Sequence, residues 1–123
     1  MPRNHNTNRN GYAWTQAEIS AVWQRGYLLP GYPSNEWRQD ECGKRMRFGE
    51  HGNRDSEYGW EIDHINPVSN GGGDQIDNLQ PLNWSNNASK SDSLLSKALR
   101  LRKYNYKKRN EAFELFSETR LYA

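Results

Sequence analysis

Two adjacent residues, Asp63 and His64, place a carboxylate beside an imidazole. Neighbouring side chains on a strand project to opposite faces unless the strand bends. Pro67 follows shortly afterwards and makes such a bend plausible. The two side chains are therefore expected to have different tasks.

Two polar residues further along complete a set that could bind a metal and a phosphate. Asn87 and Lys90 are three positions apart in a segment that predicts a helix, so they share a face and can approach one phosphate together. The side-chain oxygens of Asp63 and Asn87 are hard ligands that suit a cation keeping several waters, as magnesium does. The single cysteine, Cys42, excludes an intramolecular disulfide framework and a four-cysteine zinc site, so thiolate zinc chemistry is not indicated.

The elements that must position these residues are predicted in the order strand, glycine loop, strand and helix. Alternating residues favour a strand over 60–65, and three glycines favour a loop at 71–73. A second short strand is predicted over 79–82, after which Asn83 is placed to cap a helix that includes Asn87.

Upstream of these elements, a helix is predicted over about 15–25, because Thr15 and Glu18 have the spacing of a capping box. The polar stretch that ends at Asp40 predicts another short helical turn. Met46 and its neighbours alternate in the way a half-exposed strand would.

At this point the sequence resembles the HNH endonuclease family, over about residues 59–92. The family motif is an aspartate-histidine pair, a glycine-containing loop, an asparagine before a leucine, and a histidine or asparagine three residues before a lysine. The matching residues are Asp63, His64, Gly71, Gly72, Gly73, Asn78, Leu79, Asn87 and Lys90. Five upstream residues also look like the amino-terminal part of small stand-alone members: Trp23, Arg38, Asp40, Cys42 and Gly43.

The resemblance implies an α+β fold with a ββα-metal (His-Me finger) nuclease core and flanking helices. It implies that His64 is the general base, that Asp63 and Asn87 are metal ligands, and that Asn78 braces the loop and orients the histidine. Because asparagine stands at position 87 where the colicin nucleases have histidine, the expected metal is Mg²⁺ or Mn²⁺. The paired cysteines of many members are missing, so no structural zinc is expected.

The implied activity is metal-dependent endonuclease hydrolysis of DNA phosphodiester bonds, leaving a 5′-phosphate and a 3′-hydroxyl. Double-stranded DNA is the expected partner, and a homodimer is possible because a double-strand cut by one site per chain favours two copies. Two alternatives stay open: a non-catalytic nucleic-acid-binding module of the same fold, and a nuclease whose substrate is RNA.

The charge of the chain is uneven although its net value is only +2. Residues 1–62 carry eight basic and eight acidic side chains, whereas residues 97–110 carry seven basic and no acidic ones. This run is either a solvated helix face or a phosphate-binding surface. The residues predicted to bind nucleic acid are Lys90, Arg100, Arg102, Lys103, Lys107, Lys108 and Arg109.

The length of 123 residues predicts one domain, with residues 1–13 as a flexible leader and 93–123 as a basic helical extension. No apolar run exceeds three residues, far below the ~20 of a membrane-spanning helix. The amino-terminal stretch also lacks the apolar segment of a secretory signal, so a cytoplasmic location is expected.

Three further residues have simple interpretations from the sequence. Glu61 falls on the same strand face as Asp63 and is either an outer-shell group or part of a surface salt bridge. His5 is left without a role, and His51 is expected in an exposed loop, with a nucleic-acid contact as the alternative.

Overall fold

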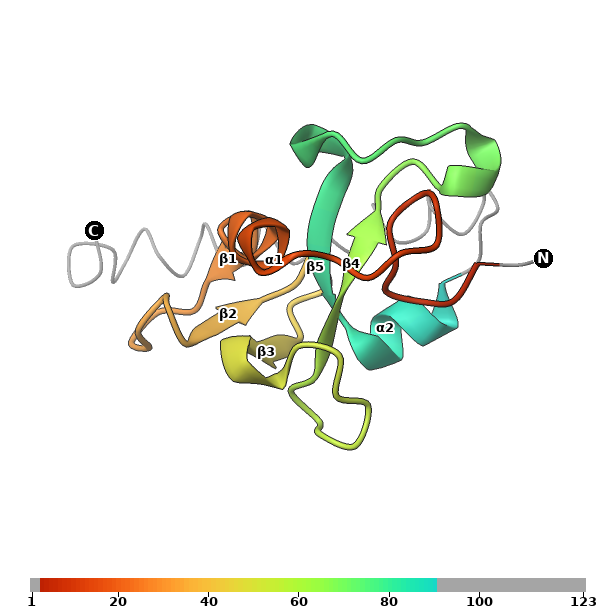
Figure 1. The fold of residues 1–123 in the computed structure, drawn as a ribbon. Helices are drawn as coiled ribbons and strands as arrows, with labels where there is room; N and C mark the ends of the chain where they lie inside the picture. The colour runs from red at the N-terminus through yellow and green to blue at the C-terminus, as the bar shows by residue number, and fades with distance from the viewer. Residues whose placement is uncertain (1–2, 91–123) are drawn as a thin grey trace.

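The computed structural model describes residues 3–90, which form two antiparallel sheets and two α-helices (Figure 1). This mixture of helices and antiparallel strands agrees with the predicted α+β class. The elements are α1 (Gln16–Trp23), β1 (Tyr27–Leu28), β2 (Trp37–Gln39), β3 (Arg45–Arg47), β4 (Trp60–His64), β5 (Leu79–Asn83) and α2 (Trp84–Ser89). Three single-turn 3-10 helices lie at Phe48–Glu50, Val68–Asn70 and Ile76–Asn78.

Helix α1 confirms the predicted capping box. The Thr15 hydroxyl accepts a hydrogen bond from the Glu18 amide at 3.1 Å, and the Glu18 carboxylate accepts one from the Thr15 amide at 2.8 Å. The helix buries its apolar stripe, including Val22 and Trp23, against the core. Local capping and periodicity are therefore sufficient to define this element.

The helical turn predicted before Asp40 is wrong, because β2 occupies residues 37–39 at the centre of the sheet β1-β2-β3. Arg38 is buried there, and its guanidinium donates to the carbonyls of Ser34 at 3.0 Å and Gly26 at 2.9 Å. A buried polar side chain with backbone partners gives no apolar alternation. The sequence pattern therefore concealed this strand.

Strands β4 and β5 form a hairpin with α2 directly after it, in the predicted order. Trp60 pairs with Asn83 and His64 with Leu79, so Asp63 lies opposite Gln80. All five residues of β4 are buried. The Asn83 side chain caps α2 by accepting from the Ser85 amide at 3.0 Å, as predicted.

An aromatic core joins α1 to both sheets. The rings of Trp23 and Trp60 lie 5.1 Å apart, and Phe48 packs on Trp23 at 5.4 Å in an edge-on arrangement. Met46 of β3 and Ile62 of β4 complete the contact between the two sheets. Burial of such side chains contributes roughly 1.5–3 kcal/mol each, so this cluster holds β4 rigidly in place.

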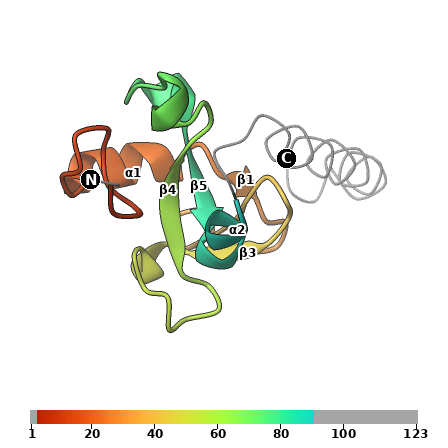
Figure 2. The same ribbon diagram turned by 90° about the vertical axis from the view of Figure 1, so that its right-hand side faces the viewer.

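The amino-terminal segment 3–13, expected to be a flexible leader, lies along the open edge of β4 (Figures 1 and 2). The Asn6 side-chain oxygen accepts a hydrogen bond from the Ile62 amide of β4 at 2.9 Å. Asp74 accepts the Arg9 amide at 3.1 Å through one oxygen, and Thr7 pairs with Ala13 in an isolated bridge. The segment therefore has specific partners in the structure.

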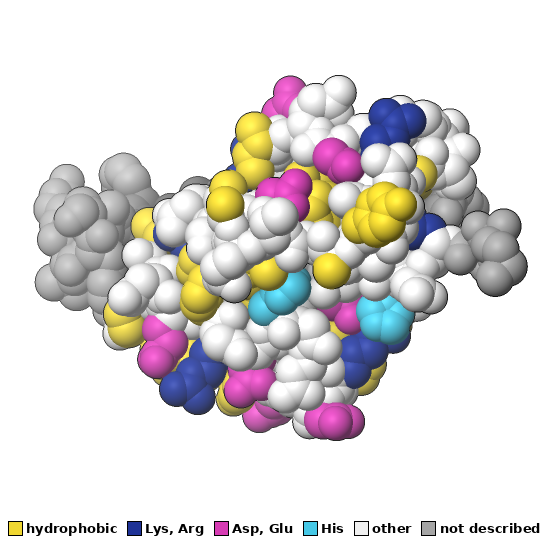
Figure 3. All heavy atoms as spheres, viewed as in Figure 1, with side chains coloured by type: hydrophobic (Ala, Val, Ile, Leu, Met, Phe, Trp, Pro, Cys, Tyr) yellow, Lys and Arg dark blue, Asp and Glu magenta, His cyan; other side chains and the backbone are white. Residues whose placement is uncertain are grey.

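Within residues 3–90, no helix is long and apolar enough to cross a membrane. On the face shown in Figure 3, acidic and basic side chains are interspersed. The predicted helical extension 93–123, with Arg100, Arg102, Lys103, Lys107, Lys108 and Arg109, lies outside the described residues.

Candidate active site

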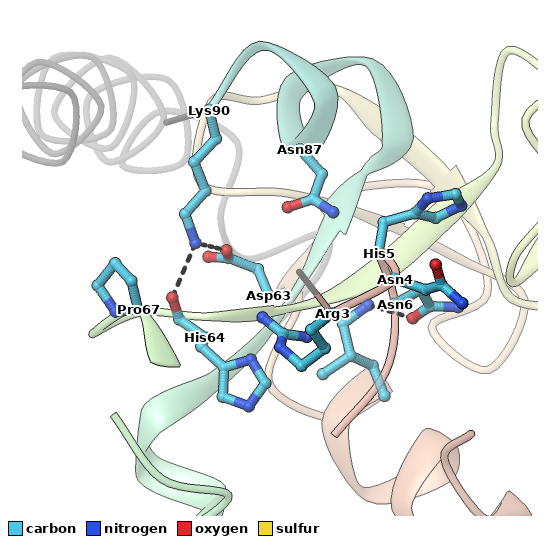
Figure 4. A pocket seen from close by; sticks show the side chains of 10 residues that line it. Arg3, Asn4, His5, Asn6, Asp63, His64, Pro67, Asn87 and Lys90 are labelled. Atoms are coloured by element: carbon cyan, nitrogen blue, oxygen red, sulfur yellow. Dashed lines mark hydrogen bonds and ion pairs between the residues drawn. The ribbon is translucent and has the colours of Figure 1, made fainter. Parts of the chain in front are cut away.

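A cleft of about 220 Å³ opens beside β4, between α2 and the amino-terminal segment (Figure 4). Asp63 and His64 both line it, and the backbone bends at residues 65 and 66, directly after β4, as predicted. The lining residues are Arg3, Asn4, His5, Asn6, Ile62, Asp63, His64, Pro67, Asn87 and Lys90.

Asp63 is buried and held by polar partners. Its Oδ2 accepts a hydrogen bond from Gln80 Nε2 at 2.8 Å, across the hairpin, and its Oδ1 pairs with the ammonium of Lys90. Lys90 also donates to the His64 carbonyl oxygen at 2.8 Å (Figure 4). The cleft thus contains a carboxylate whose position is fixed by β5 and which forms an ion pair with a side chain from the end of α2.

His64 is almost completely buried, and its Nε2 lies 2.7 Å from Asp74 Oδ1. The indole of Trp14 packs against the imidazole at 5.7 Å. Burial lowers the pKa of His64; the hydrogen bond to Asp74 opposes this effect, but the positive charges of Arg3 and Arg9 add to it, and the pKa lies below its usual value. The imidazole is therefore neutral near pH 7.

Because the Asp74 carboxylate can only accept, the neutral imidazole carries its proton on Nε2 and the lone pair on Nδ1. Asp74 is not among the cleft-lining residues, whereas His64 is. The nitrogen that can accept a proton is therefore Nδ1, the ring nitrogen that is not bonded to Asp74.

Asn78 braces the loop that follows β4. Its Nδ2 donates to the carbonyls of Gly73 at 2.8 Å and Asn66 at 3.1 Å, and its Oδ1 accepts the Asn66 amide at 2.8 Å. Gly72 is required in this loop, because a Cβ there would come within 1.8 Å of the Asn66 carbonyl oxygen. The braced loop brings Asp74 to His64.

Glu61 forms the salt bridge considered from the sequence, with Arg54, but its carboxylate is fully buried and does not lie on the surface. Arg54 makes two hydrogen bonds to its carboxylate, both at 2.8 Å, and Asn87 Nδ2 donates to Oε1 at 2.8 Å. Burial alone would raise the pKa of Glu61, but these hydrogen bonds outweigh it and the pKa is lowered. Glu61 is thus an ionised carboxylate that fixes the Asn87 amide.

Asn87 and Lys90 contact the same face of β4, at Glu61 and Asp63 respectively. Asn87 lies in α2, whereas Lys90 is the C-cap residue in an extended conformation, so the helix predicted to include both ends before Lys90. With Nδ2 engaged by Glu61, the Asn87 amide turns its oxygen toward Asp63 (Figure 4).

The two histidines given little weight in the sequence both lie near this network. His5 lines the cleft with its Nε2 3.6 Å from Glu61 Oε2, and its side chain is 57% exposed. His51 is half-buried, packs on Trp60 at 4.8 Å and contacts Asn6 through Nε2 at 3.1 Å. His51 therefore supports the amino-terminal segment. The prediction of an exposed loop did not anticipate this contact.

The donor set of the cleft fits a hard divalent cation. The carboxylate of Asp63 and the amide oxygen of Asn87 are both oxygen ligands, and the Lys90 ammonium already places a positive charge at Asp63. In the described part of the chain no group of three or more His, Cys, Asp or Glu side chains is arranged to hold a metal. Two protein oxygens leave most of the coordination shell to water and substrate, which is typical of Mg²⁺.

Sequence reasoning did not identify the partners that orient these groups, namely Asp74, Arg54 and the segment 3–6. Asp74 directly follows the glycine loop, and a carboxylate at that point of a braced loop could have been suspected. Arg54 lies seven residues before Glu61 in a polar loop and gave no local signal.

The comparisons with known proteins agree with the motif residues. Residues 40–93 match the family model described as HNH endonuclease, the family that the sequence motif resembles. Searches of curated proteins and of solved structures found no match. Members of this family act on nucleic acids and generally use divalent metal ions, so nuclease activity in general is implied.

Proposed function

We propose that the protein is a metal-dependent endonuclease that hydrolyses DNA phosphodiester bonds, with His64 as general base. One observation carries the proposal: a buried imidazole, oriented by Asp74, lies in the same cleft as the carboxylate of Asp63. The family match over residues 40–93 independently supports nuclease chemistry.

The proton transfer follows from the hydrogen bonds of His64. A water molecule in the cleft gives a proton to Nδ1 as the water oxygen attacks phosphorus. Nε2 keeps its own proton, which stays hydrogen-bonded to Asp74. The imidazolium that forms is stabilised by the Asp74 carboxylate. Bond cleavage releases the 3′-oxygen, which takes a proton from solvent, and leaves a 5′-phosphate on the other fragment.

In this proposal Asp63 and Asn87 hold Mg²⁺ or Mn²⁺. When bound, the metal supplies Lewis-acid stabilisation of the charge that develops on the phosphate and the leaving oxygen. Gln80 fixes the Asp63 carboxylate through Oδ2, and Glu61 keeps the Asn87 oxygen directed into the cleft. Lys90, which reaches the cleft from the end of α2, neutralises a phosphate of the substrate.

Double-stranded DNA is the proposed substrate, and a homodimer would account for a double-strand cut. The basic run over residues 97–109 is proposed to bind backbone phosphate, as the sequence suggested. RNA is the alternative substrate and forms a separate arm of the test.

The test is incubation of the purified chain with supercoiled plasmid and with RNA, using magnesium, manganese or chelator. We expect metal-dependent nicking or linearisation of the plasmid. His64→Ala should lose roughly 10²- to 10⁴-fold in rate, the usual contribution of a general base, while DNA binding persists.

A matched pair of carboxylate variants controls for the loss of charge. Asp63→Asn should abolish metal-dependent cleavage, whereas Asp55→Asn, in an exposed loop outside the cleft, should cleave like the parent. Cleavage by His64→Ala at the parental rate would remove His64 from the mechanism. Binding without cleavage under every metal would favour the non-catalytic module.

A further inference from the structure

The wall of the cleft opposite Asp63 and Asn87 is made by residues 3–6, which lie outside the segment matched by the family model (Figure 4). Two of these residues, Arg3 and His5, can carry positive charge. The cleft therefore has a second source of cationic groups, separate from α2.

The hydrogen bonds of Asn6 attach this wall to the catalytic strand. The Ile62 amide on the open edge of β4 donates to Asn6 Oδ1 at 2.9 Å, and His51 contacts the same amide group. Asn6 adopts a left-handed backbone conformation, with φ +55°, which reverses the chain and turns residues 3–5 toward the cleft. A wall attached one residue before Asp63 holds its position relative to the reacting groups.

Arg3 is exposed and partly restrained. Its Nη1 donates to the Thr7 carbonyl at 2.7 Å and to the Thr7 hydroxyl at 3.2 Å. A guanidinium has five N–H donors, so these bonds orient it without exhausting its donors. Partial restraint of this kind reduces the entropy lost when an anion binds.

The charge balance of the cleft favours an anion. Among the ten lining residues, Arg3 and Lys90 are basic side chains, and Asp63 is the single carboxylate. The buried Glu61 carboxylate, which lies near His5, is compensated by two hydrogen bonds from Arg54. A polyanion entering the cleft therefore meets excess positive charge on the amino-terminal side.

We propose that Arg3 and His5 form a phosphate-binding wall that contacts the nucleic-acid backbone beside the scissile phosphate. This inference rests on the proposed function and extends it to a substrate contact outside the HNH segment. Arg3 binds the phosphate through its remaining guanidinium donors, and His5 donates a hydrogen bond from its imidazole. Both contacts are to backbone, so they position the substrate without reading its sequence.

The test measures duplex DNA affinity as a function of salt, with calcium, in a His64→Ala background that prevents turnover. Each phosphate contact contributes about 0.9 to the slope of log affinity against log salt. Arg3→Gln should lower this slope by about 0.9 and weaken binding roughly 10-fold, while Arg3→Lys should keep the slope. His5→Ala should weaken binding in the same direction.

The matched control is Arg47→Gln, which removes one positive charge from β3, outside the cleft. Its salt slope should equal that of the parent, and the urea midpoint of Arg3→Gln should be unchanged. If the parent binds and cleaves DNA but Arg3→Gln keeps the parental salt slope, the phosphate-binding role of residues 3–6 is refuted and the nuclease assignment stands. If the parent neither binds nor cleaves nucleic acid, the proposed function falls and the wall falls with it.

Discussion

Replacement of Asn78 tests whether the loop after β4 controls the reactivity of His64. The Asn78→Ala change removes three hydrogen bonds, two donated to the carbonyls of Gly73 and Asn66 and one accepted from the Asn66 amide. At about 0.5–1.5 kcal/mol each, the loss is roughly 1.5–4.5 kcal/mol. Because Asn78 is half-buried and water can replace part of these bonds, we expect the lower half of that range.

The catalytic effect should exceed the effect on folding. The loop carries Asp74, whose carboxylate lies 2.7 Å from His64 Nε2, and a relaxed loop lets this contact lengthen. We therefore expect Asn78→Ala to cleave roughly 10- to 100-fold more slowly than the parent, even where it is fully folded. Urea unfolding gives the free energy of unfolding. Plasmid nicking, measured at urea concentrations far below the midpoint of unfolding, gives the cleavage rate.

Two further variants make the result specific. Asn78→Asp keeps an acceptor for the Asn66 amide but turns a carboxylate toward two carbonyls, so it should be at least as destabilising as Asn78→Ala. Asn70→Ala removes one exposed hydrogen bond from the same loop and should change stability by less than about 0.5 kcal/mol. If Asn78→Ala matched Asn70→Ala in both stability and rate, the bracing role would be refuted.

Four other predictions follow from the same site and from the basic run. Asp74→Ala should slow cleavage roughly 10- to 100-fold, with partial rescue in Asp74→Asn, which keeps an acceptor; equal rates in all three proteins would reject the orienting role. Burial lowers the pKa of His51, and the opposing charge of Glu61 does not cancel this effect. The stability that neutral His51 contributes above pH 6.5 is therefore lost as the pH falls through the pKa of His51 in the folded protein. Unfolding free energies measured between pH 5 and 8 should therefore vary less with pH in His51→Gln than in the parent. If the basic run binds phosphate, replacing four of its residues with glutamine should flatten the salt slope of DNA binding, and an unchanged slope would identify the run as a solvated face. The four residues are Arg102, Lys103, Lys107 and Lys108. Calcium should bind the His64→Ala protein more tightly with duplex DNA than without it, since the phosphate adds a ligand; equal calorimetric affinities would contradict the two-oxygen site.

The sequence was sufficient where a structural signal is local. The Thr15–Glu18 capping box and the Asn83 cap each span a few residues, and both are present as predicted. The two strands around the glycine loop were visible from residue patterns within five positions, although burial does not alternate along β4, where all five residues are buried. The juxtaposition of Asp63 with α2 then followed from element order.

The parts that could not be predicted depend on hydrogen bonds between distant residues. The contact of Asn6 with the Ile62 amide joins positions 56 residues apart, and a polar side chain that caps a strand edge leaves no periodic pattern. Strand β2 was missed for a related reason, since Arg38 is buried by carbonyl partners and looks like a surface residue in the sequence. Site geometry in this protein is set largely by such polar contacts.

The two carboxylates on one face of β4 differ in function because their cationic partners differ. Glu61 is bound by two nitrogens, Nε and Nη2, of the planar guanidinium of Arg54, a geometry that is difficult to displace, so Glu61 serves as a fixed anchor. Asp63 is paired with Lys90, a flexible point charge at the end of a short helix, which a divalent cation can replace. In the proposed mechanism this exchange has a second consequence, because the ammonium released from Asp63 is already beside the cleft and can neutralise the incoming phosphate.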